Sequence, residues 1–301
     1  MTLMQYKPKK SLELKPEYRF ARAKKALGQN FLKSEPALRR ILEAGEIKKG
    51  DVILEIGPGK GKLTEKLLEK IYPAVAGQGL VIAVEKDREL FEFLKEKFAK
   101  KIEKRSLVLV HGDILDFQVE SYKVKSYKVI ANIPYNITGA ILKKFLTAEH
   151  QPTSMVLMVQ HEVAKRILGR EGKAKPLKIK PSGVARSAKS GFRESLLSIS
   201  VKAYGEPKMV MKVPARYFSP SPKVDSAVIS IKNISRKFFT QNDINEDRFW
   251  EILRMGFAHK RKKLFGNLKS LKSGNFDSKK ELIGNKRAED LTLSDWVELA
   301  K

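Results

Sequence analysis

The chain has 301 residues and an apolar fraction of 42%, which is typical of a globular protein with one large domain and a smaller one. It contains no cysteine, which excludes a disulfide framework, a thiolate zinc site and a cysteine nucleophile. Its 61 basic and 34 acidic residues give a formal net charge of +27. This charge favours a polyanionic partner, most often nucleic acid, over the general lysine richness of proteins from a hot or salt-adapted source.

The N-terminal end is polar and basic. Residues 1–26 form an arm in which Lys and Arg far outnumber Glu13 and Glu17, and we expect it to be flexible until it binds, with a solvated tail as the alternative. The arm lacks the apolar centre of a signal peptide, and no apolar run in the chain is long enough to span a membrane. We therefore expect a cytoplasmic protein. After the loop 26–32, Ser34 is a plausible N-cap for a helix over 37–44.

A strand, a glycine turn and a helix then follow in direct succession. The apolar run 51–56 predicts a strand, Gly57-Pro58-Gly59-Lys60-Gly61 predicts a turn, and residues 62–71 predict a helix. Glycines allow the backbone to approach a ligand, and a helix N-terminus offers free N–H groups. The spacing departs from GxGxxG and no Gly-Lys-Ser/Thr follows, so we expect a nucleotide-type site but not a phosphate-binding P-loop.

Polar residues follow the next three predicted strands, over 79–84, 106–111 and 127–131. Glu85, or alternatively Asp87, is placed to accept hydrogen bonds from both hydroxyls of a ribose. Asp113 is placed to accept from an adenine amine, with a surface turn as the alternative. A fifth strand is predicted over 154–160, and helices over 88–101 and 161–168 alternate with the strands. This alternation predicts a mainly parallel α/β sheet, with the polar residues at the strand ends where such sheets bind ligands.

The segment Asn132-Ile133-Pro134-Tyr135 follows the fourth strand, and a helix is expected from Gly139. The side-chain oxygen of Asn132 and the carbonyl of Ile133, which Pro134 forces into an extended conformation, can both accept hydrogen bonds from an NH2 group. Tyr135 offers an aromatic face for a planar base. Taken alone, the segment is equally compatible with a turn at the end of a strand.

The second half of the chain begins with a basic stretch over 169–193, which we interpret as a loop beside the active edge or a solvated linker. A strand pair is predicted over 195–203 and 208–213, and a final strand over 228–231. Between them, prolines stiffen a loop that we expect to hold Phe218 out as a second stacking face, with a core phenylalanine as the alternative. From residue 235 the periodicity is helical, and the basic cluster 259–263 follows a helix over 248–257.

Six segments together are far more specific than any one of them: Gly28-Gln29-Asn30-Phe31-Leu32, Glu55-Ile56-Gly57-Pro58-Gly59-Lys60-Gly61, Asn132-Ile133-Pro134-Tyr135, Phe218-Ser219-Pro220-Ser221-Pro222-Lys223-Val224-Asp225-Ser226, Phe257-Ala258-His259-Lys260-Arg261-Lys262-Lys263 and Arg287-Ala288-Glu289. They resemble, nearly end to end, the motifs of the ribosomal RNA adenine dimethyltransferases (the KsgA type). The chief departure is 169–193, where the family has a shorter connection leading into a Tyr-Gly-Arg-Leu-Ser-like stretch.

The resemblance implies an α/β class I S-adenosylmethionine-dependent methyltransferase fold, which is Rossmann-like, over 27–234 and a small helical RNA-binding domain over 235–301. It implies dimethylation of the N6 amines of two adjacent adenosines near the 3′ end of small-subunit rRNA, with a role in small-subunit maturation. The partners would be this rRNA and the small ribosomal subunit or its precursor, with no membrane, no metal and a monomeric chain. The target-base site would contain Asn132, Ile133, Pro134, Tyr135 and Phe218. The cofactor site would contain Asn30, Leu32, Gly57, Gly59, Glu85, Asp113 and Asn132.

Three other functions remain open at this point. A large-subunit rRNA adenine methyltransferase of the macrolide-resistance type shares the catalytic motifs, although the block 218–226 fits it less well. A ribosome-assembly factor without turnover would not need an intact glycine turn and Asn-Ile-Pro-Tyr motif. A protein-glutamine methyltransferase is disfavoured by the basic surface and by Ile133 in place of a proline.

Overall fold

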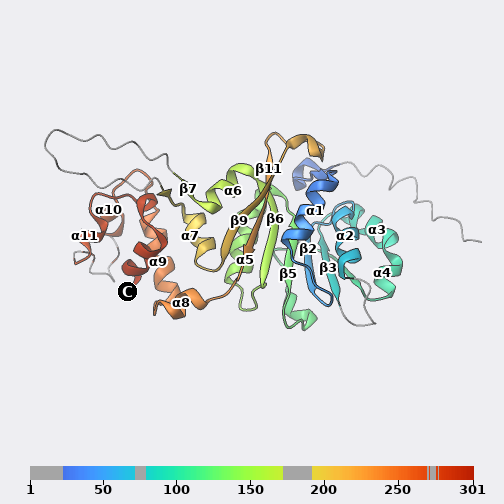
Figure 1. Cartoon of the computed structure of the whole chain (residues 1–301), viewed down its shortest axis with the longest axis horizontal. Coiled ribbons are helices and arrows are strands. Elements are labelled where there is room, and N and C mark those ends of the chain that lie inside the picture. Colours follow the sequence, from blue (N-terminus) through green and yellow to red (C-terminus); the bar gives the residue numbers. More distant parts are fainter. Residues whose placement is uncertain (1–22, 72–78, 172–191, 270, 272–275, 277) are drawn as a thin grey trace, which may run out of the picture.

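A seven-stranded sheet forms the centre of the molecule (Figure 1). The computed structural model describes residues 23–71, 79–171, 192–269, 271, 276 and 278–301. The strand order is β4 (Leu107–His111), β3 (Leu80–Glu85), β2 (Val52–Ile56), β5 (Lys128–Asn132), β6 (Ser154–Gln160), β11 (Ser226–Lys232) and β9 (Glu206–Val213). The first five strands are parallel, and β11 runs antiparallel to both β6 and β9.

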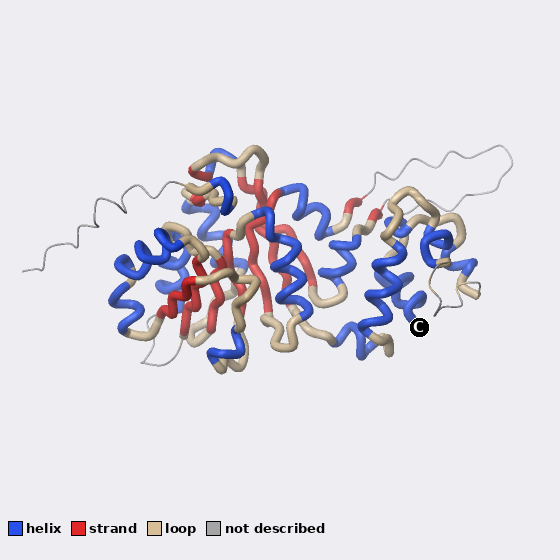
Figure 2. Tube along the Cα trace, turned by 180° about the vertical axis from the view of Figure 1, so that it is seen from behind, coloured by secondary structure: helices blue, strands red, loops and turns tan. Residues whose placement is uncertain are grey.

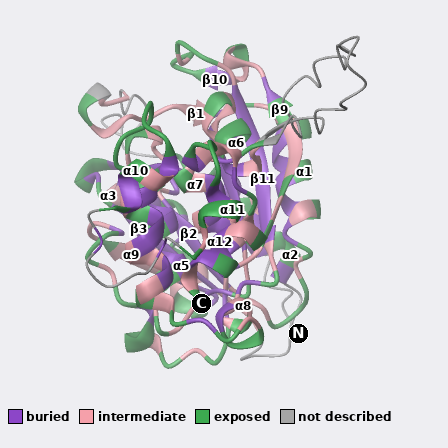
Figure 3. Ribbon diagram, turned by 90° about the vertical axis from the view of Figure 1, so that its left-hand side faces the viewer, coloured by how far each residue is buried: buried purple, intermediate pink, exposed green. Residues whose placement is uncertain are grey.

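Helices cover both faces of the sheet, because its strands carry apolar side chains on both sides. One hydrophobic core joins the sheet to α1 (Glu35–Ala44), α2 (Lys62–Ile71) and α3 (Arg88–Lys97). The other joins it to α5 (Thr138–Thr147), α6 (His161–Leu168) and α7 (Leu196–Lys202). Neighbours on one strand divide between the two cores, as Ile53 and Leu54 do in β2. Figure 3 shows the buried strands between these layers, and Figure 2 gives the view from behind.

The predicted elements of the first half are confirmed with small changes of boundary. Ser34 caps α1 by accepting a hydrogen bond from the backbone N–H of Ala37. The helix expected over 88–101 is divided at Phe98 into α3 and α4 (Ala99–Glu103). A Cβ atom on Gly61 would lie 2.6 Å from the Phe98 ring, so the close packing of this ring on the glycine turn accompanies the break.

The strand expected over 195–203 is wrong, because the segment is helix α7. Ser195 and Ser198 form a reciprocal capping box that starts a helix, and Ile199 and Val201 are buried. The strand expected over 208–213 is part of β9, and its partner is β11 instead. The preference of β-branched residues for strands was overridden by this cap and by the pairing of β9 elsewhere.

The C-terminal segment is helical, as predicted, with α8 (Lys237–Gln241), α9 (Glu246–Gly256), α10 (Leu264–Leu268), α11 (Lys280–Ile283) and α12 (Leu293–Ala300). These helices lie at the opposite end of the molecule from α2, α3 and α4 (Figure 1). Trp250 and Phe239 pack on Tyr204, which follows α7. Arg236 donates to the carbonyls of Ala148 and Thr147 after α5. The helices therefore share one continuous core with the sheet.

Two of the predicted basic segments are described only at their ends. Most of the arm 1–26 and of the loop 169–193 lies outside the described residues. The two ends of the loop form a short antiparallel pair, β7 (Arg170–Glu171) and β8 (Phe192–Arg193). After β8, the Glu194 N–H donates to the carbonyl of Glu289, which places the end of the loop beside the C-terminal helices. Among the described residues, no helix is long and apolar enough to cross a membrane.

Candidate active site

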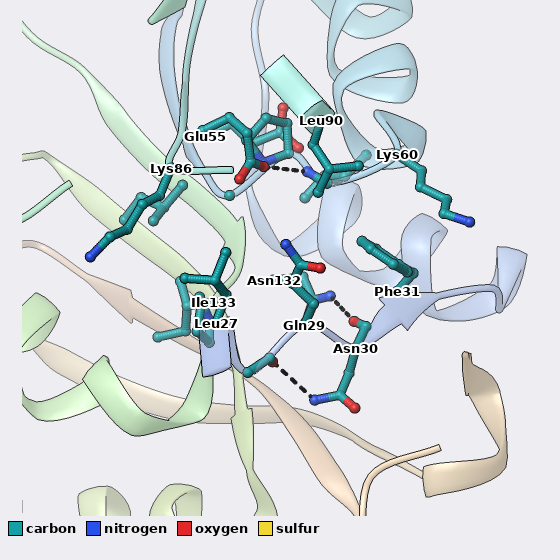
Figure 4. Close-up of a pocket in the computed structure, with 18 of the residues that line it drawn as sticks. Leu27, Gln29, Asn30, Phe31, Glu55, Lys60, Lys86, Leu90, Asn132 and Ile133 are labelled. Atoms are coloured by element: carbon teal, nitrogen blue, oxygen red, sulfur yellow. Dashed lines mark hydrogen bonds between the residues drawn. The ribbon is translucent and has the colours of Figure 1, made fainter. Parts of the chain in front are cut away.

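A cavity of about 450 Å³ opens at the carboxyl ends of β2, β3 and β5. Figure 4 shows side chains from these strand ends and from the segment 27–31 pointing into it. The structure brings the predicted cofactor residues together here, since its lining includes Asn30, Leu32, Gly57, Gly59, Glu85, Asp113 and Asn132. Ile133, Pro134 and Tyr135 also line it.

The glycine turn has a backbone that only glycine adopts without strain. Gly57 and Gly59 have φ angles of +63° and +60°. A Cβ atom on Gly59 would lie 3.1 Å from the ring of Phe31. The backbone N–H of Gly59 donates to Oε2 of Glu85 at 3.0 Å, so the turn and the acidic residue at the end of β3 are held as one unit.

Glu85 is buried, at 5% exposure, and burial raises the pKa of its carboxyl group. Its Oε1 accepts from the backbone N–H of Asp87 at 2.9 Å. Asp87 itself caps α3 and accepts from Gln29 and Lys24, each at 2.8 Å. Asp87 does not belong to the cavity lining whereas Glu85 does, so of the two alternatives Glu85 is the one that faces the cavity.

Asp113 already has partners on both carboxylate oxygens. Oδ2 pairs with Nζ of Lys86 at 2.6 Å, and Oδ1 accepts from the N–H of Leu115 at 2.9 Å. The Lys86 ammonium lowers the pKa of the Asp113 carboxyl. A carboxylate has about four acceptor positions, so a ligand amine can share Oδ1 or Oδ2 with these donors.

Asn132 is oriented by the N-terminal segment. Its Nδ2 donates to the backbone carbonyl of Asn30 at 3.1 Å, and Nδ2 of Asn30 donates to the carbonyl of Gly28 at 3.1 Å. Figure 4 draws both bonds. Because the donor end of the Asn132 amide is occupied, its oxygen remains as the group that can accept from a ligand.

Tyr135 begins a short 3-10 turn, η4 (Tyr135–Ile137), directly after Pro134. Its hydroxyl lies 2.5 Å from Oγ of Ser226, the first residue of β11. The ring lines the cavity and is half-buried. The side chain of Ile133, which precedes Pro134, is buried at 2% exposure, and this fixes the segment against the core.

The expectation that the proline-rich loop holds Phe218 out as a stacking face is wrong. The ring is buried, at 2% exposure, in the core that includes α1 and α2. Its backbone pairs with Leu32, because β10 (Phe218–Ser219) and β1 (Phe31–Leu32) form a two-stranded sheet. This pairing directs the ring inward, and Phe218 does not belong to the cavity lining.

The predicted site residues did not include Glu55, Phe31 or Lys86, which also line the cavity, although the motifs quoted above contain the first two. Glu55 lines the cavity at 1% exposure, its Oε2 has no hydrogen-bond partner among the described residues, and burial raises the pKa of its carboxyl to about 8. Phe31 covers the glycine turn, with Nζ of Lys60 5.0 Å from its centroid. Lys86 pairs with Asp113. The one available signal concerned Glu55, because its carboxyl group lies within the apolar run 51–56, and an acidic residue is rarely buried unless it has a function.

Comparison with known proteins decides the family. The profile described as Ribosomal RNA adenine dimethylase matches residues 20–179 and 181–301. The chain belongs to this family. The resemblance predicted from the motifs is therefore confirmed, and the chain is an rRNA adenine dimethylase by family membership. Among the described residues of this dimethylase, no group of three or more His, Asp or Glu residues is arranged to hold a metal ion.

Two curated relatives show how far the likeness extends. The Ribosomal RNA small subunit methyltransferase A of Dehalococcoides mccartyi (strain CBDB1) is 37% identical over 289 residues, covering 92% of this chain and 87% of that protein. The protein of the same name from Nostoc punctiforme is 36% identical over 300 residues, covering 93% and 94%. The likeness thus extends over nearly the whole of each protein.

Two solved structures confirm the fold. A dimethyladenosine transferase from Plasmodium falciparum is similar with a TM-score of 0.67 and 26% identity, covering 89% of this chain and 95% of that one. The 23S rRNA methyltransferase ErmE is similar with a TM-score of 0.64 at 22% identity, covering 90% and 98%; this likeness concerns the fold alone. The predicted class I S-adenosylmethionine-dependent methyltransferase fold is confirmed.

Proposed function

We propose that this dimethylase transfers methyl groups from S-adenosylmethionine to the N6 amines of two adjacent adenosines near the 3′ end of small-subunit rRNA, as part of small-subunit maturation. The observation that carries the proposal is the fixed amide of Asn132. Its donor end is bound to Asn30 and its oxygen is left for the cavity, directly before Pro134 and the aromatic face of Tyr135. This arrangement suits a planar base that carries an amine. The curated relatives named small subunit methyltransferase A favour the small subunit as the source of that base.

The cavity residues fit S-adenosylmethionine. The positive φ angles of Gly57 and Gly59 favour residues without a Cβ atom, so the turn itself adds no side chain that would keep a ligand from the backbone. Glu85 would accept from the ribose hydroxyls and Asp113 from the adenine amine. Asn30, Leu32 and Asn132 would lie around the methionine part. When bound, the group supplies a methyl on a sulfonium, which is already activated for transfer.

The side chains of this protein would act on the amine rather than on the methyl donor. An adenine amine is a poor nucleophile, because its lone pair is delocalised into the ring. The oxygens of Asn132 and of the Ile133 carbonyl would accept hydrogen bonds from its two N–H groups and draw these hydrogens out of the ring plane. The lone pair would then point toward the methyl group for an in-line displacement, aided by orientation and fixed dipoles.

The target base must leave its stack to reach this cavity, and unstacking costs a few kcal/mol. Tyr135 would replace part of the lost stacking. Since Phe218 is buried, the second face of the base has to be covered by another group. Phosphate contacts from the basic arm, the loop 169–193 and the cluster 259–263 would offset the rest of the cost. The partner would be the small ribosomal subunit or its precursor, with the protein acting as a cytoplasmic monomer.

The proposal is tested with labelled S-adenosylmethionine and small ribosomal subunits from a strain that lacks this methylation. The rRNA is digested and its nucleosides are separated. Labelled N6,N6-dimethyladenosine from the 3′ region is the expected result. Label in large-subunit RNA and none in small-subunit RNA would favour the macrolide-resistance type of enzyme instead. No label in either RNA, together with tight binding to the subunit, would favour an assembly factor.

A further inference from the structure

The proline-rich block 218–226 lines the cavity at Ser219, and it holds a second lining residue, Tyr135, through Ser226. Ser226 is fully buried, at 0% exposure, and its Oγ lies 2.5 Å from the hydroxyl of Tyr135, 91 residues earlier in the chain. No other hydrogen bond to this Oγ occurs among the described residues. A buried hydroxyl without a partner is costly, so each of these two groups depends on the other.

Ser226 is held between the two strands that flank β11 in the sheet. As the first residue of β11 it lies opposite Gln160 in β6 and Val213 in β9. The preceding residue, Asp225, is held three times: its carbonyl accepts from the N–H of His161 at 3.0 Å, Oδ1 accepts from the N–H of Ala215 at 3.0 Å, and Oδ2 pairs with Lys212 at 2.8 Å. Ser226 is therefore a fixed point against which a neighbouring side chain can be oriented.

Tyr135 is held at both of its ends. Its carbonyl accepts from Oγ1 of Thr138 at 3.0 Å, which stabilises the 3-10 turn that begins with it. Its hydroxyl is held by Ser226. Because the hydroxyl lies at the far end of the ring, a bond there stops the ring from swinging about the Cα–Cβ bond. Burial raises the pKa of Tyr135, so the phenol keeps the proton that one of the two oxygens must donate.

We propose that Ser226 is a positioning residue of the target-base site, which fixes the ring of Tyr135 as the stacking surface for the flipped adenine. This inference rests on the proposed function. The plane of the stacked base sets the direction in which its amine meets the methyl group, and a small error of position is expensive in rate. Ser226 does not belong to the cavity lining, so its effect on transfer would pass through Tyr135.

The test compares the wild type with Ser226→Ala, Tyr135→Phe and the double variant, each assayed with undermethylated small ribosomal subunits. We expect either single change to lower kcat about tenfold, as the loss of one buried hydrogen bond predicts, with the KM for S-adenosylmethionine unchanged. The double variant should be no slower than either single variant, because both changes remove the same bond. An increased share of N6-monomethyladenosine among the products is also expected.

Ser230→Ala is the matched control. Ser230 is also buried, at 3% exposure, and lies on β11, but it is opposite Val156 and Lys208, away from Tyr135. It should keep the wild-type kcat. If Ser226→Ala lowers stability too far for assay, Tyr135→Phe removes the same bond and leaves β11 intact.

Three results would overturn the inference. The first is a wild-type kcat in Ser226→Ala or Tyr135→Phe. The second is a double variant whose loss is the product of the two single losses. The third is coupling between the two changes in urea unfolding without any methyl transfer to rRNA by the wild type. This last result would refute the proposed function and leave the hydroxyl pair as a structural bond only.

Discussion

The side-chain amide of Asn132 donates to the backbone carbonyl of Asn30 at 3.1 Å, across 102 residues of chain. This bond does two things at once. It attaches the N-terminal segment to the carboxyl end of β5, and it decides which end of the Asn132 amide faces the cavity. The orientation of the proposed hydrogen-bond acceptor is therefore set before any substrate binds, which is the condition for electrostatic preorganisation.

Replacing Asn132 by Ala should reduce methyl transfer by at least about 100-fold, since comparable single preorganised groups contribute this much to the rate. Binding of rRNA should change little, because the phosphate contacts are elsewhere. Transfer is measured with labelled S-adenosylmethionine, and binding by filter retention of the same RNA. Near-normal turnover in this variant would refute the proposed role of Asn132.

Gln29 lines the cavity and holds the N-terminal segment over the proposed cofactor site. Its Nε2 donates to Oδ2 of Asp87 at 2.8 Å, and its Oε1 accepts from the N–H of Lys24 at 2.8 Å. Gln29→Ala leaves a carboxylate oxygen of a nearly buried Asp87 with one partner fewer. We expect the Kd for S-adenosylmethionine, measured by calorimetry, to rise about tenfold.

The control for this prediction is Gln241→Ala, an exposed residue at the end of α8. It should leave the Kd unchanged. Equal Kd values for Gln29→Ala and the wild type would show that the segment stays in place without this bond.

Burial of Glu55 makes stability depend on pH. Its carboxyl has a pKa of about 8 in the folded protein against 4.5 as the ordinary value, chiefly because burial disfavours the charge. Between these pH values the folded protein binds a proton that the unfolded chain has released. The free energy of unfolding therefore falls as pH rises through this window, by up to about 1.4 kcal/mol per pH unit, and levels off above it.

Glu55→Gln removes this titration and keeps the shape of the side chain. Urea unfolding of both proteins at about pH 5 and about pH 8 should show that the variant gains stability relative to the wild type at the higher pH. Glu85 is present in both proteins, so the difference reports on Glu55. An identical pH dependence in the two proteins would mean that Glu55 is already ionised in the fold.

The sequence predicted the ends of strands well and the contacts between distant segments poorly. Glu85, Asp113 and Asn132 were placed correctly at one edge, because the carboxyl ends of parallel strands meet there and the residue after a strand is read directly from the chain. Local patterns carry no such information about Phe218. Its burial depends on pairing with Leu32, far away in the sequence, and an aromatic residue between prolines is compatible with either outcome.

The contact between Tyr135 and Ser226 was invisible for the same reason. A serine at the start of a strand is ordinary, and its role depends on β11 entering the sheet antiparallel, beside β6. The prediction of a strand over 195–203 was wrong for a different reason. There the spacing of Ile199 and Val201 fits a strand, but the capping box of Ser195 and Ser198, which is itself a local signal, indicates a helix.

The exposed cluster Lys260, Arg261 and Lys262 lies between α9 and α10 with no ion pair to an acidic residue among the described residues. If these side chains bind phosphates, changing all three to Ala should reduce the slope of log K against log salt by about 0.7–0.9 for each lost contact. Binding to small-subunit rRNA is measured over a range of salt concentrations. The control is Lys48→Ala with Lys49→Ala. These two residues are exposed just before the start of β2, at the end of the strand away from the cavity, and changing them should leave the slope unchanged. A slope that both changes reduce equally would indicate non-specific binding over the whole surface.

Two helical glycines predict opposite effects of the same substitution. A Cβ atom on Gly256, at the end of α9, would lie 2.4 Å from the ring of Trp296 in α12. Gly256→Ala must therefore push the two helices apart, and we expect a loss of about 1–3 kcal/mol in the free energy of unfolding.

Gly266 in α10 has open surroundings, because no atom lies within 4 Å of the place that a Cβ atom would take. Gly266→Ala should stabilise the protein by about 0.5–1 kcal/mol through helix propensity. Urea unfolding followed by Trp fluorescence measures both. An unaffected Gly256→Ala would contradict the packing of α9 on α12, and a destabilised Gly266→Ala would contradict the open surroundings of Gly266 in α10.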